Sequence, residues 1–260
     1  MNTLARLDAP VAMRKISTVT FDLWDTLIQE YPDRMERVAQ TRIDGIRELL
    51  GRKGVVHSQD EIRRAYMDTG KFLELTWSKH RDMDTTDQVL FMLSSLDDKL
   101  ATRLERGDLA EIVAVYCGGL LDNPPRLLPG AKDALRAVRS QGYRVGLISN
   151  TGRTPGSVLK VMMGQMGILG FFDTTTFSNE ILVRKPAEGA FRITLENLRA
   201  VPKAAVHIGD SEESDIRGAK AVGMRAIQVM REGRPASKLA DAQVGSLDAV
   251  IESVDRLGSV

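Results

Sequence analysis

The sequence has 260 residues, of which 43% are hydrophobic and 27% charged, a composition typical of a soluble globular protein with one or two domains. The 36 Lys and Arg residues nearly balance the 35 Asp and Glu residues, and the net charge of +1 argues against nucleic acid or an anionic membrane as a partner. Because the single cysteine, Cys117, cannot form an internal disulfide, we expect an intracellular, cytoplasmic protein.

The N-terminal residues are expected to precede the folded part of the chain. Residues 1–15 mix charged and isolated apolar side chains, and we expect them to form a leader. They lack the apolar core of about 7–15 residues that marks a signal peptide. No stretch of the sequence approaches the roughly 18 apolar residues of a membrane span.

The first predicted strand lies within residues 16–27. It is rich in β-branched residues and uncharged up to Phe21, as expected of a buried parallel strand. Two acidic residues, Asp22 and Asp25, follow together at its end.

Residues 30–122 have the character of a helical insertion. Apolar residues recur at helical spacing, as at Ile43, Ile46 and Leu50, and residues typical of helix N-caps, such as Asp60 and Asp108, precede such runs. We expect about four helices and no strands in this segment.

After Pro124-Pro125 the sequence alternates between strand and helix patterns. Helices are expected over residues 131–141, 156–166, 186–198 and 214–222, and strands over 143–149, 174–178, 204–209, 226–230 and near Val244, ahead of a terminal helix. Such alternation predicts an α/β fold with a doubly wound parallel sheet. The sheet domain would comprise residues 16–29 and 123–260, and residues 30–122 would form an inserted all-α domain.

Reactive side chains follow several of these predicted strands. Because the carboxyl ends of parallel strands meet at one edge of a sheet, we expect these side chains to lie close together. They are Asp22, Asp25 and Thr26, then Ser149-Asn150-Thr151, then Lys185, and finally Asp210 and Asp215. Carboxylates that bind a divalent cation, beside a lysine and a hydroxyl for phosphoryl oxygens, favour phosphate chemistry. His207, within the strand before Asp210, is expected to be a buried, hydrogen-bonded residue.

Four motifs resemble those of the haloacid dehalogenase superfamily, and they occur in the same order. They are Phe21-Asp22-Leu23-Trp24-Asp25-Thr26-Leu27, Ile148-Ser149-Asn150, Lys185-Pro186, and Gly209-Asp210 with Asp215. The resemblance runs from about Ile16 to Val250. It implies a Rossmann-like core with a C1-type helical cap, as in subfamily I of these hydrolases.

The resemblance also implies a role for each matching residue. Asp22 would be the nucleophile, Lys185 would offset its charge, and Ser149 would hydrogen-bond the transferring group. The Mg²⁺ ligands would be Asp22, the backbone carbonyl of Trp24, Asp210 and Asp215, the last as a ligand or as support for the others.

Substrate contacts are expected near the ends of the first two strands. The resemblance implies that Thr26 steadies the loop beside the substrate and that Asn150 lies at the substrate site. Arg153 follows Asn150 closely enough to contact an anion, although a role at the surface fits it equally well. The implied substrate is a small phosphorylated or halogenated molecule.

One position departs from the phosphatases of this superfamily. They carry a second Asp two residues after the nucleophile, which protonates the leaving group and then activates water. That position is Trp24 here, and its side chain has no proton to transfer. Since a general acid and base contributes about 10²–10⁴-fold, we expect slow turnover unless another group substitutes. Asp25, one residue further, either braces the loop or replaces the acid.

The residues leave several functions open, and we favour Mg²⁺-dependent hydrolysis of a phosphomonoester through an aspartyl-phosphate on Asp22. A metal-independent 2-haloacid dehalogenase would explain Trp24, because that branch tends to carry an aromatic residue there, but it usually lacks Gly209-Asp210. Phosphonatase-like chemistry would need a lysine of the cap as a Schiff base, and the candidates are Lys53, Lys71 and Lys79. A binding module that holds a phosphorylated ligand without turnover is the last alternative.

Overall fold

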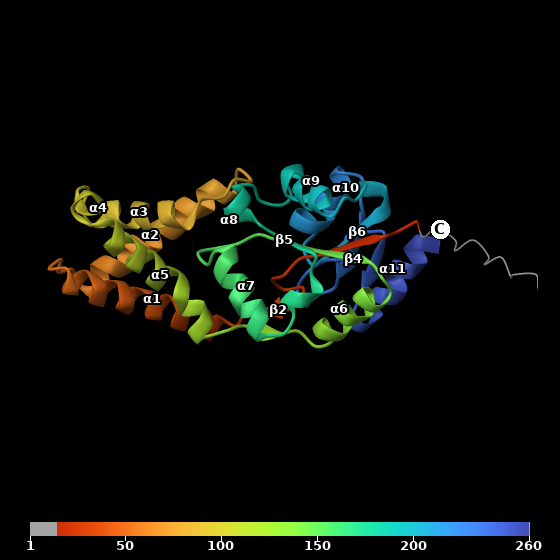
Figure 1. The fold of residues 1–260 in the computed structure, drawn as a ribbon, viewed down its shortest axis with the longest axis horizontal. Helices are drawn as coiled ribbons and strands as arrows, with labels where there is room; N and C mark the ends of the chain where they lie inside the picture. The colour runs from red at the N-terminus through yellow and green to blue at the C-terminus, as the bar shows by residue number, and fades with distance from the viewer. Residues whose placement is uncertain (1–14, 260) are drawn as a thin grey trace, which may run out of the picture.

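Six parallel strands form the central sheet of the protein, in the order β5-β4-β1-β6-β7-β8 (Figure 1). The computed structural model describes residues 15–259, so the expected leader lies outside the described residues except for Lys15. The strands are β1 (Thr18–Phe21), β4 (Arg144–Ser149), β5 (Thr174–Phe177), β6 (Ala205–Gly209), β7 (Arg225–Val229) and β8 (Ala242–Val244).

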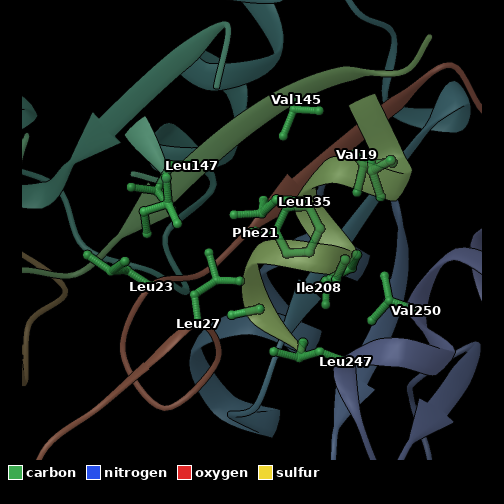
Figure 2. Close-up of a cluster of buried hydrophobic side chains, with 14 of the residues drawn as sticks. Val19, Phe21, Leu23, Leu27, Leu135, Val145, Leu147, Ile208, Leu247 and Val250 are labelled. Atoms are coloured by element: carbon green, nitrogen blue, oxygen red, sulfur yellow. The ribbon is translucent and has the colours of Figure 1, made fainter. Parts of the chain in front are cut away.

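Alternate side chains of each strand lie on opposite faces of the sheet. Helices cover both of these faces. On one face, Val19 and Phe21 of β1 join a cluster that includes Leu135 of α6 (Figure 2). This cluster also holds residues of α7 and α11. On the other face, Phe191 of α9 packs in a cluster with Ile148 of β4 and residues of α10. The helices are α6 (Ala131–Ser140), α7 (Gly156–Gln165), α9 (Glu188–Asn197), α10 (Arg217–Ala221) and α11 (Val250–Ser259). The predicted doubly wound α/β fold is therefore confirmed.

The strand order reverses at β1, and this reversal positions the site. The chain adds β4 and β5 on one side of β1 and then returns to place β6, β7 and β8 on the other. In open parallel sheets, ligands bind in the crevice beyond the carboxyl ends of the strands at such a reversal. Asp22 directly follows β1 and Asp210 directly follows β6, so the topology brings two distant carboxylates to this crevice.

Between β1 and β4 the chain forms the helical block, α1–α5, which extends away from the sheet (Figure 1). The helices are α1 (Pro32–Arg52), α2 (Gln59–Trp77), α3 (Thr85–Leu96), the single turn α4 (Leu100–Arg103) and α5 (Arg106–Asp122). They enclose a hydrophobic cluster of their own, with Ile43, Ile46 and Tyr116 among its members. Ser58 caps α2 in a reciprocal capping box with Glu61. Four long helices thus occupy the segment in which about four were expected.

The structure differs from the predicted elements at the borders of the helical block. The first strand ends at Phe21, and the chain then pairs β2 (Ile28–Gln29) with β3 (Arg126–Leu127) in a two-stranded antiparallel ribbon. This ribbon joins the two connections between the block and the sheet, and its strands are too short to leave a periodic pattern in sequence. Of the helices that the structure describes, none has both the length and the apolar character to cross a membrane.

Candidate active site

Three carboxylates meet at the carboxyl edge of the sheet. Asp22 follows β1, Asp210 follows β6, and Asp215 lies on a π-helical turn, Glu212–Ile216. Their exposed fractions are 7%, 2% and 0%, and one oxygen from each lies within 4.8 Å of the other two. Gly209 permits this approach, because a Cβ at that position would lie 2.3 Å from Cγ of Asp215.

Lys185 supplies the positive charge at the centre of this cluster. Its Nζ donates hydrogen bonds of 2.6 Å to Oδ1 of Asp22 and of Asp215. Asn150 fixes the backbone of Lys185: its Oδ1 accepts from the Lys185 amide at 2.8 Å, and its Nδ2 donates to the carbonyl at 3.0 Å. The second predicted motif therefore holds the third in place.

Asp215 is held by further hydrogen bonds that use both of its oxygens. Oδ1 also contacts Nε2 of His207 at 3.2 Å, and Oδ2 accepts from the amide of Ser211 at 3.0 Å. Burial lowers the pKa of His207, so its imidazole is neutral and donates from Nε2, while Nδ1 accepts from the Thr20 hydroxyl at 2.8 Å. Burial alone would raise the pKa of Asp215, but Lys185 and His207 outweigh it and lower that pKa. Asp215 is therefore an ionised anchor for Lys185.

Asp210 differs from Asp215 because one of its buried oxygens has no hydrogen bond. Oδ1 accepts from the Thr26 hydroxyl at 3.4 Å, whereas Oδ2 has no hydrogen-bond partner. Nε of Arg234 lies 2.8 Å from Oδ2, but outside hydrogen-bonding geometry. A buried carboxylate oxygen that has no hydrogen bond and pairs only with the Arg234 guanidinium, beside the Asp22 carboxylate, fits a hard divalent cation such as Mg²⁺. The residues present therefore fit a metal site built on Asp22 and Asp210.

Both carboxyl groups of this site bind protons more readily than ordinary Asp side chains. Burial and the nearby charges of Asp215 and Asp210 outweigh Lys185 and raise the pKa of Asp22 to about 8. Burial and the charge of Asp215 raise the pKa of Asp210 to about 6. Without a cation, the site thus retains protons near neutral pH.

Because protons compete with a cation for these oxygens, Mg²⁺ affinity is expected to rise as pH increases from about 5.5 to 8.5. The steepest change should fall near the pKa values of Asp210 and Asp22, about 6 and about 8. Calorimetric Mg²⁺ titrations in buffers of different ionisation enthalpy measure both the affinity and the protons released. Asp210→Asn is the control that should remove the lower step. Equal affinity at pH 5.5 and 8.5 would contradict the expectation.

The remaining predicted residues lie around this cluster in different ways. Ser149 is buried at the end of β4, and its hydroxyl makes only a 3.4 Å contact with the carbonyl of Asn150. Thr26 is fully buried and contacts Asp210, so it supports a carboxylate from behind. The backbone carbonyl of Trp24 as a metal ligand stays a prediction.

Two cavities with common wall residues lie beside the carboxylates. The catalytic chamber, of about 280 Å³, is lined by Asp22, Lys185 and Asp210 among others. A second cavity of about 360 Å³, here called the block–sheet cavity, lies between the helical block and the loops after β1 and β4. Trp24, Asp25, Asn150 and Arg184 line both cavities, so the two cavities are neighbours.

Sequence reasoning missed the arginines around these cavities. Arg231 donates to the carbonyls of Asp25 and Thr26, at 2.6 and 3.1 Å, and Arg234 donates to Oδ2 of Asp25 at 3.3 Å. Both follow β7, so the strand-end rule that located Asp22 could have located them. Asp25 has a φ of 56°, a left-handed conformation. The hydrogen bonds from Arg231 and Arg234 brace its loop, which was one of the two roles expected for Asp25.

Arg34 and Arg42 of α1 and Arg184 also line the block–sheet cavity, together with Arg153. Positions 34 and 42 lie on one stripe of α1, but helical spacing alone does not distinguish a cavity wall from a hydrophobic core. Arg184 precedes the predicted Lys185 directly, and it is neutralised by Asp82 at 2.9 Å. Arg153, which was predicted to contact an anion, faces this cavity and stacks on the Tyr66 ring at 3.8 Å.

Comparison with known proteins identifies the family. The family model for haloacid dehalogenase-like hydrolases matches residues 16–223. The chain therefore belongs to the haloacid dehalogenase-like hydrolase family, as its motifs predicted.

Several curated relatives in this family are phosphatases. A phosphoglycolate phosphatase from Pseudomonas putida is 26% identical over 226 residues, which cover 84% of this chain and 71% of that protein. A phosphoserine phosphatase from Thermus thermophilus is 32% identical over 126 residues, 48% of this chain and 49% of that protein. Matches to the first four curated relatives cover only 40% to 63% of their lengths.

Solved structures of similar fold include both chemistries of the superfamily. A phosphatase from Thermococcus onnurineus has a TM-score of 0.62 and 24% identity, covering 92% of this chain and 98% of that one. A 2-haloacid dehalogenase from Pseudomonas syringae has a TM-score of 0.66 and 23% identity, covering 93% and 99%. These likenesses establish the fold, and the choice between the two chemistries depends on the site.

Proposed function

We propose that this protein hydrolyses a phosphomonoester of a small metabolite with the help of Mg²⁺, using Asp22 as the nucleophile. The observation that carries this proposal is Oδ2 of Asp210, a buried carboxylate oxygen without a hydrogen bond beside Asp22. A cation site next to a buried nucleophile suits a reaction that transfers a dianionic phosphoryl group. The phosphatases among the relatives favour the same reaction class.

The side chains of the catalytic chamber account for the binding and transfer of the phosphoryl group. An oxygen of Asp22 attacks phosphorus, the bond to the leaving alcohol breaks, and water then releases phosphate from the aspartyl-phosphate. Lys185 contacts Asp22 at 2.6 Å and offsets its charge as the anion approaches. When bound at Asp22 and Asp210, Mg²⁺ would neutralise phosphoryl oxygens. The Ser149 hydroxyl is available to donate to one of those oxygens.

Further residues hold the side chains of the catalytic chamber in position. Asp215 and its partner His207 orient Lys185, so we propose that Asp215 supports the metal site without being a ligand itself. Thr26 orients Asp210. We further propose that residues 16–29 and 123–260 act as the catalytic core and residues 30–122 as its cap, compatible with the C1 type.

The lack of an acidic side chain at position 24 lowers the rate of hydrolysis that we expect. Trp24 lines the chamber together with Asp22, and its indole offers no proton for an alkoxide leaving group. Asp25 lines the chamber as well, but its carboxylate accepts a hydrogen bond from Arg234. We therefore expect slow turnover of alkyl phosphates, whose leaving groups need a proton.

The other chemistries have weaker support from the described residues. A Schiff-base lysine needs a lowered pKa in the cavity wall, but Lys53 and Lys71 donate hydrogen bonds to Asp108 and Asp68, and these contacts raise the pKa values of both lysines. Neither these two nor Lys79 lines either cavity. A dehalogenase would leave the cation-binding geometry of Asp210 without a purpose, and it remains an outcome of the test below.

The test is turnover of p-nitrophenyl phosphate with Mg²⁺ and with a chelator. We expect Mg²⁺-dependent release of nitrophenolate by the wild type, and a loss on the order of 10⁴-fold or more in Asp22→Asn, since the nucleophile is removed. Thermal unfolding of both proteins controls for folding. Equal activity in Asp22→Asn would refute the nucleophile. Halide release from 2-haloacids without metal would instead establish the dehalogenase, and phosphate binding without turnover would establish a binding module.

A further inference from the structure

Two cationic side chains of the block–sheet cavity have no anionic partner. Arg42 is 4% exposed and donates to the Tyr66 hydroxyl at 3.3 Å and to Oγ1 of Thr154 at 2.6 Å. Its Nε is buried and has no hydrogen-bond partner. No carboxylate of residues 15–259 lies within 4.0 Å of this guanidinium, so its charge is balanced only by neutral oxygens.

Arg153 lies in the same wall and is equally without a carboxylate partner among the described residues. It donates to the Tyr116 hydroxyl and to the Tyr66 carbonyl, both at 2.8 Å, and its guanidinium stacks on the Tyr66 ring. Gly70 of α2 permits this approach, because a Cβ there would lie 2.6 Å from Nη2 of Arg153. The backbone of the helical block is thus shaped around this arginine.

The other two arginines of the cavity are neutralised. Arg184 pairs with Asp82, and Arg34 pairs with Glu30. Burial of an unpaired charge is unfavourable. Two such charges in one cavity wall therefore indicate a binding site for an anion that comes from outside the protein. Arg42 and Arg153 both contact Tyr66 and both line the block–sheet cavity, which places the two guanidinium groups in one wall.

The position of this pair relative to the nucleophile defines a two-site ligand. The block–sheet cavity and the catalytic chamber share the wall residues Trp24, Asp25, Asn150 and Arg184. A molecule whose phosphoryl group lies at Asp22 and that extends along these shared residues would reach the cavity lined by Arg42 and Arg153.

We infer that the Arg42–Arg153 pair binds a second anionic group of the substrate, which is a carboxylate or a second phosphate. The substrate is then a small molecule whose two anionic groups lie in the two cavities. This inference rests on the proposed function for the position of the phosphoryl group. Guanidinium groups bind both anions through paired, charge-assisted hydrogen bonds. The pair thereby selects anionic metabolites over neutral alkyl phosphates.

Equilibrium binding tests this inference without turnover. The only two tryptophans of the chain, Trp24 and Trp77, both line the block–sheet cavity, so intrinsic fluorescence reports its occupancy. Titrations in chelator use 2-phosphoglycolate as the carboxylate probe, methylenediphosphonate as the second-phosphate probe and ethyl phosphate as the probe without a second anion. We expect one of the first two to bind about 10–100-fold more tightly than ethyl phosphate.

Arg42→Met should weaken the binding of the preferred probe far more than that of ethyl phosphate and thereby abolish this preference. Gly70→Ala provides a second variant, because it displaces Arg153 without removing a charge, and it should reduce the preference. Arg63→Met, which removes a partly exposed arginine of α2 that pairs with Glu36 of α1, is the matched control and should retain it. Equal affinity for all three probes, or equal losses for all probes in Arg42→Met, would overturn the inference. Preferential binding without Mg²⁺-dependent turnover would refute the proposed function alone.

Discussion

Replacement of Trp24 by Asp is expected to raise Mg²⁺-dependent hydrolysis of ethyl phosphate by about 10²–10⁴-fold, the usual contribution of a general acid and base. Trp24 lines the catalytic chamber together with Asp22, so a carboxyl group at this position has access to the same space as the substrate. It can protonate the departing alkoxide and then accept a proton from the water that attacks the aspartyl-phosphate.

A comparison of two leaving groups distinguishes an effect of proton transfer from an effect of the larger chamber that the smaller side chain creates. Nitrophenolate departs without a proton, so the first step with p-nitrophenyl phosphate should gain less than the first step with ethyl phosphate. Trp24→Asn is the matched control, since it has the size of Asp but no proton to transfer at neutral pH. Single-turnover measurements of both substrates separate formation of the aspartyl-phosphate from its hydrolysis. If Trp24→Asn gained as much as Trp24→Asp, the enlarged chamber and not the acid would explain the effect.

The Trp24→Asp variant should also differ from the wild type in its preference among substrates. Trp24 also lines the block–sheet cavity, so it belongs to the walls of both cavities. An acid at this position would place a negative charge on the path of an anionic substrate. We therefore expect Trp24→Asp to gain less with 2-phosphoglycolate than with ethyl phosphate.

The sequence located the carboxylates correctly because their positions follow from local patterns and one rule of topology. The strands of the sheet are short and rich in β-branched and apolar residues. Asp22 and Asp210 directly follow two of them, and Ser149 ends a third. Parallel strands place these ends at one edge, so their proximity needs no knowledge of packing. Asp215 is a partial exception: a helix was expected from Ser214, but the Ser211 side chain accepts from the Ser214 amide and begins a π-helical turn earlier.

Arg153 was expected near an anion, but its pairing with Arg42 could not be predicted, because it depends on how the helical block docks on the sheet. Arg42 belongs to α1 and Arg153 to the loop after β4, and both contact Tyr66 of α2 and Tyr116 of α5. An arginine on a buried helix face has the same periodicity as a core residue. The ribbon of β2 and β3 was missed for a related reason, since two-residue strands form only where the two connections lie side by side.

Removal of the Lys185 charge by Lys185→Met is expected to lower the free energy of unfolding by about 3–5 kcal/mol, the usual effect of breaking a buried ion pair from one side. Met replaces most of the buried volume of the lysine stem but leaves Asp215 without its cation. Lys160→Met is the matched control, because Lys160 pairs with Glu180 at the surface and should cost less than about 1 kcal/mol. Urea unfolding at pH 7 measures both variants.

A double-mutant cycle and its pH dependence identify which carboxylate causes this loss. The pKa of Asp22 is raised to about 8, so Asp22 is largely neutral in the metal-free protein at pH 7, whereas the lowered pKa of Asp215 keeps it ionised. A second substitution, Asp215→Asn, should therefore recover more stability in Lys185→Met than Asp22→Asn does. Without Lys185, burial should raise the pKa of Asp215 above its unfolded value, and stability is then lost as pH rises through that pKa. The loss should thus be larger at pH 8 than at pH 5, and a loss independent of pH would indicate packing and not charge as its cause.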